Sequence, residues 1–137
     1  DKFSNSYVLE SDLYLYNQDL IRKYEYHSNF LGFKVDRTDD WCLETKNGII
    51  TKEKVGGLDC YQMCGISYYD KETGKQMEKD IKEVFMSPGG KERYWEQVML
   101  DVRKNNYKIY LRECKKEDII EIDTFNELKA IDKTYDV

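Results

Sequence analysis

Two aspartates stand at positions where carboxylates could bind a divalent cation. Asp12 comes just after residues 7–10 and Asp123 just after residues 118–122, two short runs typical of buried strands. Ligands of open α/β sheets bind at the carboxyl ends of strands, and Mg²⁺ takes one or two carboxylates with water and phosphate oxygens. The positions therefore predict a magnesium site at Asp12 and Asp123. The alternative is that each aspartate only starts a turn or helix, with Asp123 favouring the dipole of a helix that begins at Thr124.

The other reactive side chains do not form a catalytic arrangement. The single histidine, His27, falls in a predicted turn, and the sequence suggests no cysteine partner for it. Four cysteines without CxxC spacing lie in apolar, strand-like segments, which is typical of reduced, buried thiols in a cytosolic protein. They are Cys42, Cys60, Cys64 and Cys114. A zinc site built on Cys60 and Cys64 is the alternative, but no histidine or cysteine pair completes it.

Length and composition indicate one globular unit. The chain has 137 residues, of which 40% are hydrophobic, enough to bury the core of a single domain. Its net charge of -5 comes from 22 basic and 27 acidic residues without blocks of one sign, which argues against nucleic acid or an anionic membrane as the main partner. No apolar run approaches the roughly 18 residues of a membrane span, and the first residues lack a signal-peptide layout. We therefore expect a cytoplasmic protein.

Helical spacing of apolar residues predicts the helices that must position these side chains. The predicted helices cover residues 17–26, 74–86 and 91–104. A last helix begins at Thr124, since Thr124 and Glu127 have the spacing of a capping box. Asn17 is a good N-cap for the first of these helices.

Strands are predicted on both sides of these helices. A central group of short runs, separated by turn residues that include Asn47-Gly48, predicts an antiparallel meander; its members are residues 30–35, 41–44, 49–55 and 61–69. Further strands are expected at residues 7–10, 107–111 and 118–122. Together these elements predict an α/β fold, with a mixed sheet and flanking helices. No element precedes the strand at residues 7–10, so we expect an exposed strand edge and a homo-oligomer formed through it.

Several segments occur in the order found in bacterial CTP:phosphocholine cytidylyltransferases. They are residues 5–16 (NSYVLESDLYLY), Trp41 after an acidic turn, residues 65–70 (GISYYD), residues 94–96 (YWE) and residues 121–128 (EIDTFNEL). The chain resembles the later three-fifths of that family over essentially its whole length, and it shares the skeleton of the wider sugar-phosphate nucleotidyltransferase superfamily. The resemblance implies that residues 1–137 are a single partial domain, the later part of a Rossmann-like nucleotidyltransferase domain, holding its acceptor and metal sites.

The resemblance also implies a reaction. In that family CMP is transferred from CTP to phosphocholine, or to a similar amino-alcohol phosphate or phosphonate, and pyrophosphate is released. The aspartates that match Asp12 and Asp123 bind the catalytic Mg²⁺ there, so the resemblance gives both residues catalytic and metal-binding roles. A cation is physically sensible, because one anion attacks another and the cation offsets their repulsion.

Aromatic residues are the implied acceptor site. A quaternary ammonium cannot donate hydrogen bonds, so it is recognised by aromatic faces and nearby carboxylates. The residues that match the pocket segments of the family are Trp41, Tyr69, Asp70, Tyr94, Trp95 and Glu96. The alternative is that Tyr94 and Trp95 belong to a helix-packing stripe and that Tyr69 ends a core strand.

Two departures from the family limit what this chain is expected to do. Glu10 stands where relatives often have aspartate, two residues before the metal ligand. The Gly-rich GxGxR-type loop that cradles the triphosphate, and the lysine after it, do not occur, since Gly56-Gly57 and Gly89-Gly90 lack the strand-loop-helix context. We therefore expect this chain alone to be inactive or nearly so. The alternatives are a non-catalytic small-molecule-binding or regulatory module, another sugar-phosphate nucleotidyltransferase, and a small α+β protein without a ligand.

Overall fold

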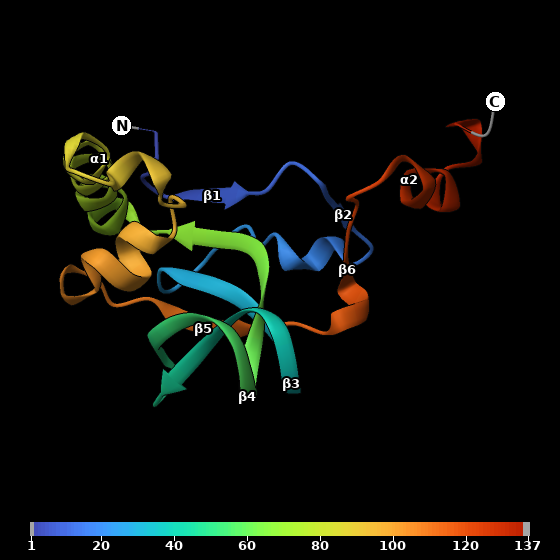
Figure 1. Cartoon of the computed structure of the whole chain (residues 1–137), viewed down its shortest axis with the longest axis horizontal. Coiled ribbons are helices and arrows are strands. Elements are labelled where there is room, and N and C mark those ends of the chain that lie inside the picture. The colour runs from blue at the N-terminus through green and yellow to red at the C-terminus, as the bar shows by residue number, and fades with distance from the viewer. Residues whose placement is uncertain (1, 136–137) are drawn as a thin grey trace.

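The computed structural model describes residues 2–135 as a mixed sheet with helices at its margins (Figure 1). Its strands are β1 (Ser6–Leu9), β2 (Leu13–Leu15), β3 (Asn29–Lys46), β4 (Ile49–Tyr69), β5 (Tyr110–Glu113) and β6 (Ile119–Glu121). Its α-helices are α1 (Lys71–Met86) and α2 (Phe125–Ile131), which lie at opposite ends of the long axis in Figure 1. The predicted α/β class is confirmed. Neither α1 nor α2, nor any shorter helix in this part of the chain, is long and apolar enough to cross a membrane.

The main sheet has the strand order β1-β4-β3-β5, and β2 pairs with β6 in a separate two-stranded sheet. The β3–β5 pair is parallel and the other pairs are antiparallel, so the predicted mixed sheet is present. Within residues 2–135 the strand β1 pairs with β4 alone, which leaves its outer edge open as the sequence indicated. Self-association through that edge stays a prediction.

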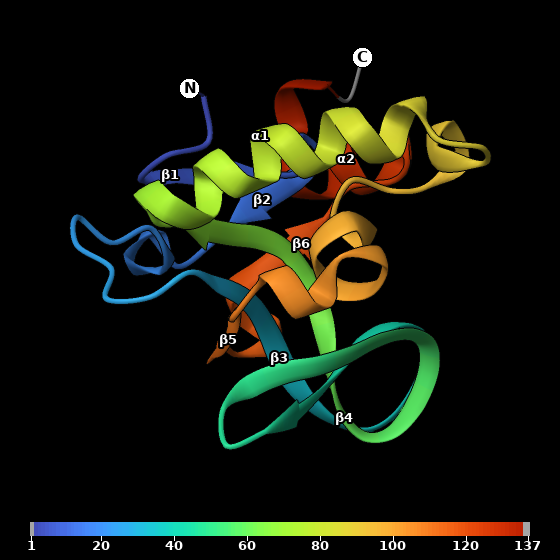
Figure 2. The same ribbon diagram turned by 90° about the vertical axis from the view of Figure 1, so that its left-hand side faces the viewer.

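The predicted meander of four short strands is wrong, because β3 and β4 form one long hairpin. Asn47 and Gly48 make its turn with φ of 53° and 76°, as expected for a tight hairpin turn. Register shifts along β3, together with positive φ at Gly56 and Asp59, bend both strands without ending their pairing. Figure 2 shows the far half of this hairpin curling back on itself. Gly56 and Gly57 therefore mark a bend within β4, whereas Asn47 and Gly48 mark the turn that ends β3.

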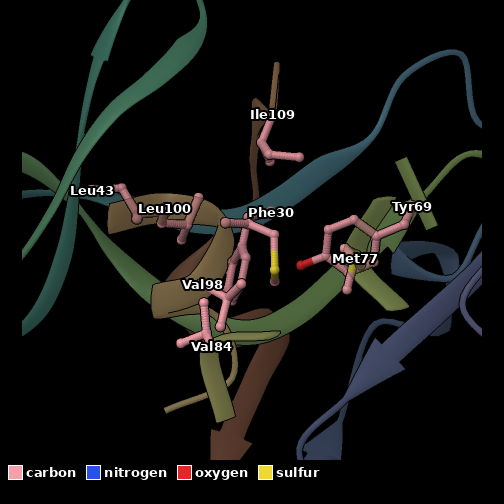
Figure 3. Close-up of a cluster of buried hydrophobic side chains, with 9 residues drawn as sticks. Phe30, Leu43, Tyr69, Met77, Val84, Val98, Leu100 and Ile109 are labelled. Carbon is pink, nitrogen blue, oxygen red and sulfur yellow. The ribbon is translucent and has the colours of Figure 1, made fainter. Parts of the chain in front are cut away.

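Two hydrophobic clusters lie on opposite faces of the sheet, because neighbouring residues of a strand point to opposite sides. Phe30 belongs to the larger cluster and Leu31 to the smaller. The larger consists of Phe30, Leu43, Tyr69, Met77, Val84, Val98, Met99, Leu100 and Ile109 (Figure 3). The smaller consists of Leu20, Leu31, Cys64, Ile66 and Cys114. The helix α1 therefore covers one face, and the segment between β2 and β3 covers part of the other.

The helix predicted over residues 17–26 is wrong. Only a 3₁₀ turn, Gln18–Leu20, forms there, and the side chain of Asn17 caps it by accepting from the backbone N–H of Asp19 at 3.1 Å. Arg112 of β5 donates to the carbonyl oxygen of Leu20 at 2.6 Å, which takes an acceptor that a continuing helix would use. A cation from a distant strand thus overrides the local helical spacing.

The helix predicted over residues 91–104 is also wrong, because this segment is broken into short turns. They are a 3₁₀ turn (Gly90–Glu92), a π-helical turn (Val98–Val102) and a second 3₁₀ turn (Lys104–Asn106). Arg93 is extended, and the side chain of Gln97 accepts the backbone N–H of Tyr94 at 3.0 Å. The break frees Tyr94 to leave the helical stripe that its spacing suggested.

The two α-helices begin at well-formed caps. The side chain of Asp70 accepts the backbone N–H of Thr73 at 2.8 Å, so α1 begins three residues earlier than predicted. At α2, Thr124 and Glu127 form the predicted capping box, which is confirmed. The cap of α2 fixes the backbone just after β6, where Asp123, the predicted metal ligand, lies.

Candidate active site

A cavity of about 440 Å³ lies between β3, β4, β6 and the segment before the π-helical turn. Apolar and sulfur-containing side chains form part of its wall, including Leu13, Phe33, Met63 and Cys64. Its polar and aromatic lining consists of Glu10, Asp40, Trp41, Gln62, Tyr94, Glu96, Lys116 and Glu121. A concave site with few convergent polar groups on apolar walls is typical of a small-molecule site.

Three carboxylates gather at one margin of this cavity. Glu10, Asp12 and Glu121 each place one carboxylate oxygen within 4.8 Å of the other two. Pairing of Leu13 with Glu121 sets their register, and the backbone N–H of Ile122 donates to the carbonyl of Asp12 at 2.8 Å. Strand pairing therefore brings together acids that lie more than a hundred residues apart.

A glycine makes room for the first of these acids. The backbone N–H of Glu10 donates to the carbonyl of Gly65 at 3.0 Å. Gly65 has φ of +63°, and a Cβ atom there would lie 2.3 Å from Oε2 of Glu10. Glycine at this position thus permits both the left-handed backbone and the close approach of the carboxylate.

Crowding of like charges changes the acidity of this cluster. Partial burial, followed by the charges of Asp12 and Glu96, raises the pKa of Glu10. Partial burial, followed by the charges of Asp123 and Asp12, raises the pKa of Glu121. A divalent cation at this margin would relieve the repulsion that, after burial, contributes to both raised pKa values.

The structure brings the two predicted aspartates to the same pair of strands. Asp12 immediately precedes β2, and Asp123 follows β6 and donates its backbone N–H to Oε2 of Glu127 at 2.9 Å. The close group of oxygens, however, includes Glu10 and Glu121 and not Asp123. Sequence reasoning missed Glu121. The signal was there, since Glu10-x-Asp12 and Glu121-x-Asp123 repeat the same acidic spacing next to strand ends.

Three of the predicted acceptor residues line the cavity. Trp41 and Tyr94 have ring centroids 5.8 Å apart at an interplanar angle of 80°, and Tyr94 is 61% exposed. Glu96 is only 7% exposed, and burial raises its pKa. The carboxylate of Asp40 fixes the backbone of Trp41, because its Oδ1 accepts the backbone N–H of Trp41 at 2.7 Å. The side chain of Gln62 donates to Oδ2 of the same carboxylate at 3.0 Å.

The other three predicted acceptor residues lie outside the lining of this cavity. Tyr69 is 1% exposed in the larger core, and its ring meets that of Trp95 edge-on at 6.1 Å. Asp70 caps α1 and also accepts from the hydroxyl of Ser28 at 2.9 Å. Core packing and helix capping therefore describe the positions of these residues, and direct substrate contact by them stays a prediction.

Two further charged residues were not singled out from the sequence. Lys116 is the only basic side chain among the described residues that line the cavity. Glu53 of β4 buries both carboxylate oxygens, and neither has a hydrogen-bond partner within residues 2–135. Burial, followed by the charges of Glu96 and Asp101, raises the pKa of Glu53 to about 8. A polar residue inside a strand does not reveal from sequence that tertiary packing will cover it.

Glu53 predicts a pH-dependent stability. The folded chain holds a proton on Glu53 up to about pH 8, whereas the unfolded chain releases it near the ordinary pKa of 4.5. Stability from this group is therefore complete below pH 4.5 and falls as the pH rises toward 8. Allowing for partial exposure, Glu53→Gln should raise the free energy of unfolding by about 2 kcal/mol at pH 9 and by much less at pH 5. Urea unfolding at both pH values measures the free energy of unfolding. Glu117→Gln, at an exposed site, is the control. Equal effects of the two variants would refute the role of the buried Glu53.

Comparison with known proteins shows what this chain is similar to. Over 136 residues it is 24% identical to the 2-aminoethylphosphonate cytidylyltransferase of Lancefieldella rimae, covering 95% of this chain and 53% of that protein. Over 138 residues it is 23% identical to the choline-phosphate cytidylyltransferase of Streptococcus pneumoniae, covering 97% of this chain and 58% of that protein. The resemblance indicated by the sequence segments is confirmed. The chain spans little more than half the length of these relatives.

A solved structure shows the same fold. The CTP:phosphocholine cytidylyltransferase of Streptococcus pneumoniae superposes with a TM-score of 0.79 at 21% identity, covering 96% of this chain and 58% of that one. No protein-family model matches the chain.

Proposed function

We propose that this chain is the acceptor-binding and metal-binding part of a nucleotidyltransferase. The reaction is transfer of CMP from CTP to phosphocholine, or to a similar amino-alcohol phosphate or phosphonate, with release of pyrophosphate. One observation carries the proposal: Glu10 and Glu121 belong both to the close carboxylate group and to the lining of the cavity that holds Trp41 and Tyr94. A metal site and an organic-cation site would then share one space.

The charges of the cavity suit a zwitterionic acceptor. The rings of Trp41 and Tyr94, with the buried carboxylate of Glu96, can bind an organic ammonium group through cation–π and charge interactions. Lys116 in the same lining offers a positive charge for a phosphate or phosphonate. An acceptor that carries both charges uses both parts of the cavity at once, which fixes its orientation.

The carboxylate group fits a hard divalent cation. Glu10, Asp12 and Glu121 present only oxygen atoms, the ligands that Mg²⁺ prefers, and Asp123 lies near enough to raise the pKa of Glu121 by its charge. Glu10, Asp12 and Glu121 would hold Mg²⁺, and Asp123, which the sequence predicts as a ligand, would lie beside them. When bound, the ion supplies charge neutralisation for the phosphoryl groups.

The chain's own residues bind and orient the acceptor and need not react with it. An acceptor phosphate oxygen attacks the α-phosphorus of CTP, the new P–O bond forms, and the bond to pyrophosphate breaks. Because the phosphate is itself the nucleophile, the chain supplies neither a covalent nucleophile nor a general base for a hydroxyl. Its contribution is to hold the ammonium end against Trp41 and Tyr94, so that the phosphate end points toward the carboxylate margin.

Tyr94→Ala tests the acceptor site. Loss of one face of the aromatic pair should weaken binding of phosphocholine to the chain by between about two-fold and thirty-fold, the range of a cation–π contact. Calorimetric titration at constant Mg²⁺ measures it. Tyr26→Ala is the matched control, because Tyr26 is 94% exposed and lies outside the cavity lining.

The outcomes of that titration separate the competing functions. Phosphocholine binding that strengthens with Mg²⁺ and weakens in Tyr94→Ala supports the proposal. Binding indifferent to Mg²⁺ would instead support a non-catalytic binding module. An equal loss in Tyr94→Ala and Tyr26→Ala, or no binding of phosphocholine or 2-aminoethylphosphonate at all, would contradict an acceptor site in this cavity.

A further inference from the structure

Two of the four cysteines lie close enough to react with each other. All four thiols are free and buried, and the Sγ atoms of Cys64 and Cys114 are 3.2 Å apart although the residues are 50 positions apart. Cys64 belongs to β4 and Cys114 follows β5, with β3 between these strands. The backbone N–H of Cys114 donates to the carbonyl of Gly32 in β3 at 3.0 Å, which fixes its position. The two sulfurs therefore meet across the middle strand.

Each of these sulfurs belongs to a residue that borders a different cavity. Cys64 lines the proposed acceptor cavity. Cys114 lines a second hollow, together with Asn17, Leu20, Arg112 and Lys115. The two cysteine residues are only 7% and 8% exposed, so large reagents are excluded while a small oxidant can approach from either hollow. The low exposure therefore limits disulfide exchange with other proteins and still leaves both thiols accessible to a small oxidant.

We propose that Cys64 and Cys114 form an oxidisable dithiol that a hydroperoxide converts to a disulfide in the folded chain. One thiolate attacks the peroxide: an S–O bond forms, the O–O bond breaks, the sulfur is oxidised to a sulfenic acid and the peroxide is reduced to water or an alcohol. The second thiol attacks that sulfur: the S–S bond forms, the S–O bond breaks, and water leaves. Overall, two thiols lose two electrons and two protons, and one hydroperoxide is consumed.

The hydrogen bond between the two thiols makes them unequal. The thiol–thiol hydrogen bond raises the pKa of Cys64 and lowers the pKa of Cys114. The thiolate is the nucleophile toward peroxide, and a lower pKa favours it at Cys114.

The disulfide would tie together two segments that position the carboxylate group. Cys64 immediately precedes Gly65, against which the carboxylate of Glu10 lies. Cys114 immediately precedes the segment that leads through a 3₁₀ turn, Lys116–Asp118, to Glu121 at the end of β6. Closing the sulfurs to bonding distance draws these two segments toward each other, so oxidation changes the spacing of the acidic side chains in the cavity wall.

Peroxide treatment of the intact, folded chain tests this proposal. Mass spectrometry should show the loss of two hydrogens per chain, and peptide mapping should show a Cys64–Cys114 link, with two of the four thiols still titratable. Cys64→Ser and Cys114→Ser should each abolish the link. The double variant Cys42→Ser/Cys60→Ser should keep it; it is the matched control because these two thiols are also free and buried.

Peroxide treatment of the unsubstituted chain tests the proposed disulfide even if a variant fails to fold. A link between Cys42 and Cys60, four thiols still reduced after peroxide treatment of the folded chain, or oxidation of Cys64 or Cys114 to sulfinic acid without a link would each overturn the proposal. None of these measurements uses an acceptor, CTP or a metal ion. Failure of the dithiol is therefore distinguishable from failure of the proposed transferase function.

Discussion

Asp12→Asn should lower the affinity of the chain for Mn²⁺, used as a spectroscopic substitute for Mg²⁺, by at least about tenfold. Asp12 is one of three side chains whose carboxylate oxygens lie within 4.8 Å of one another. Loss of one unit charge at about 4 Å from a divalent ion removes about 2 kcal/mol even in bulk water, which is more than a tenfold change in affinity. Electron paramagnetic resonance of free Mn²⁺, titrated with protein, measures the affinity directly.

The control is Asp36→Asn, which makes the same chemical change at an exposed position of β3 outside the carboxylate group and the cavity lining. Asp123→Asn then distinguishes two arrangements. A loss as large as that of Asp12→Asn would support the pair of ligands predicted from the sequence, whereas a smaller loss would support the group that contains Glu10 and Glu121. If Asp12→Asn and Asp36→Asn bind Mn²⁺ equally well, no cation site exists at this margin.

Part of the candidate site could be predicted, because some of its residues stand next to strand ends. The sequence predicts Asp12 and Asp123 just after two strands, whereas in the structure Asp12 precedes β2 and Asp123 follows the antiparallel partner strand β6. What could not be predicted is which oxygens come within reach of each other, since that depends on the register of the β2–β6 pair and on the left-handed backbone at Gly65. Strand positions follow from sequence patterns, but distances between side chains follow from tertiary pairing.

The helix prediction was correct where local signals acted alone, and it was wrong at residues 17–26, where a distant residue intervened. Thr124 and Glu127 make a cap entirely within four residues, and the structure has it. Residues 17–26 have helical spacing as well, yet no α-helix forms, because Arg112 from the other end of the chain occupies their backbone acceptors. Helical spacing describes which face is apolar, and it cannot show that a buried guanidinium will compete for the carbonyls.

Arg112→Met should lower the free energy of unfolding by about 3 kcal/mol or more. The side chains of Arg112 and Glu25 are 10% and 5% exposed, and Nη1 lies 2.7 Å from Oε1. Removing the cation leaves a buried carboxylate without its partner and frees the carbonyl of Leu20, and breaking a buried pair from one side costs about 3–5 kcal/mol. Urea unfolding followed by tryptophan fluorescence measures the change.

A second variant separates the ion pair from simple packing. Arg112→Met/Glu25→Gln should recover much of the lost stability, because the remaining buried group is no longer charged and the hydroxyl of Tyr7 can still bond to it. Arg37→Met is the matched surface control: its pair with Asp39 is 74% and 90% exposed, so its loss should cost less than about 1 kcal/mol. If the double variant is as unstable as Arg112→Met, the contact with the Leu20 carbonyl, and not the ion pair, holds this segment in its non-helical form.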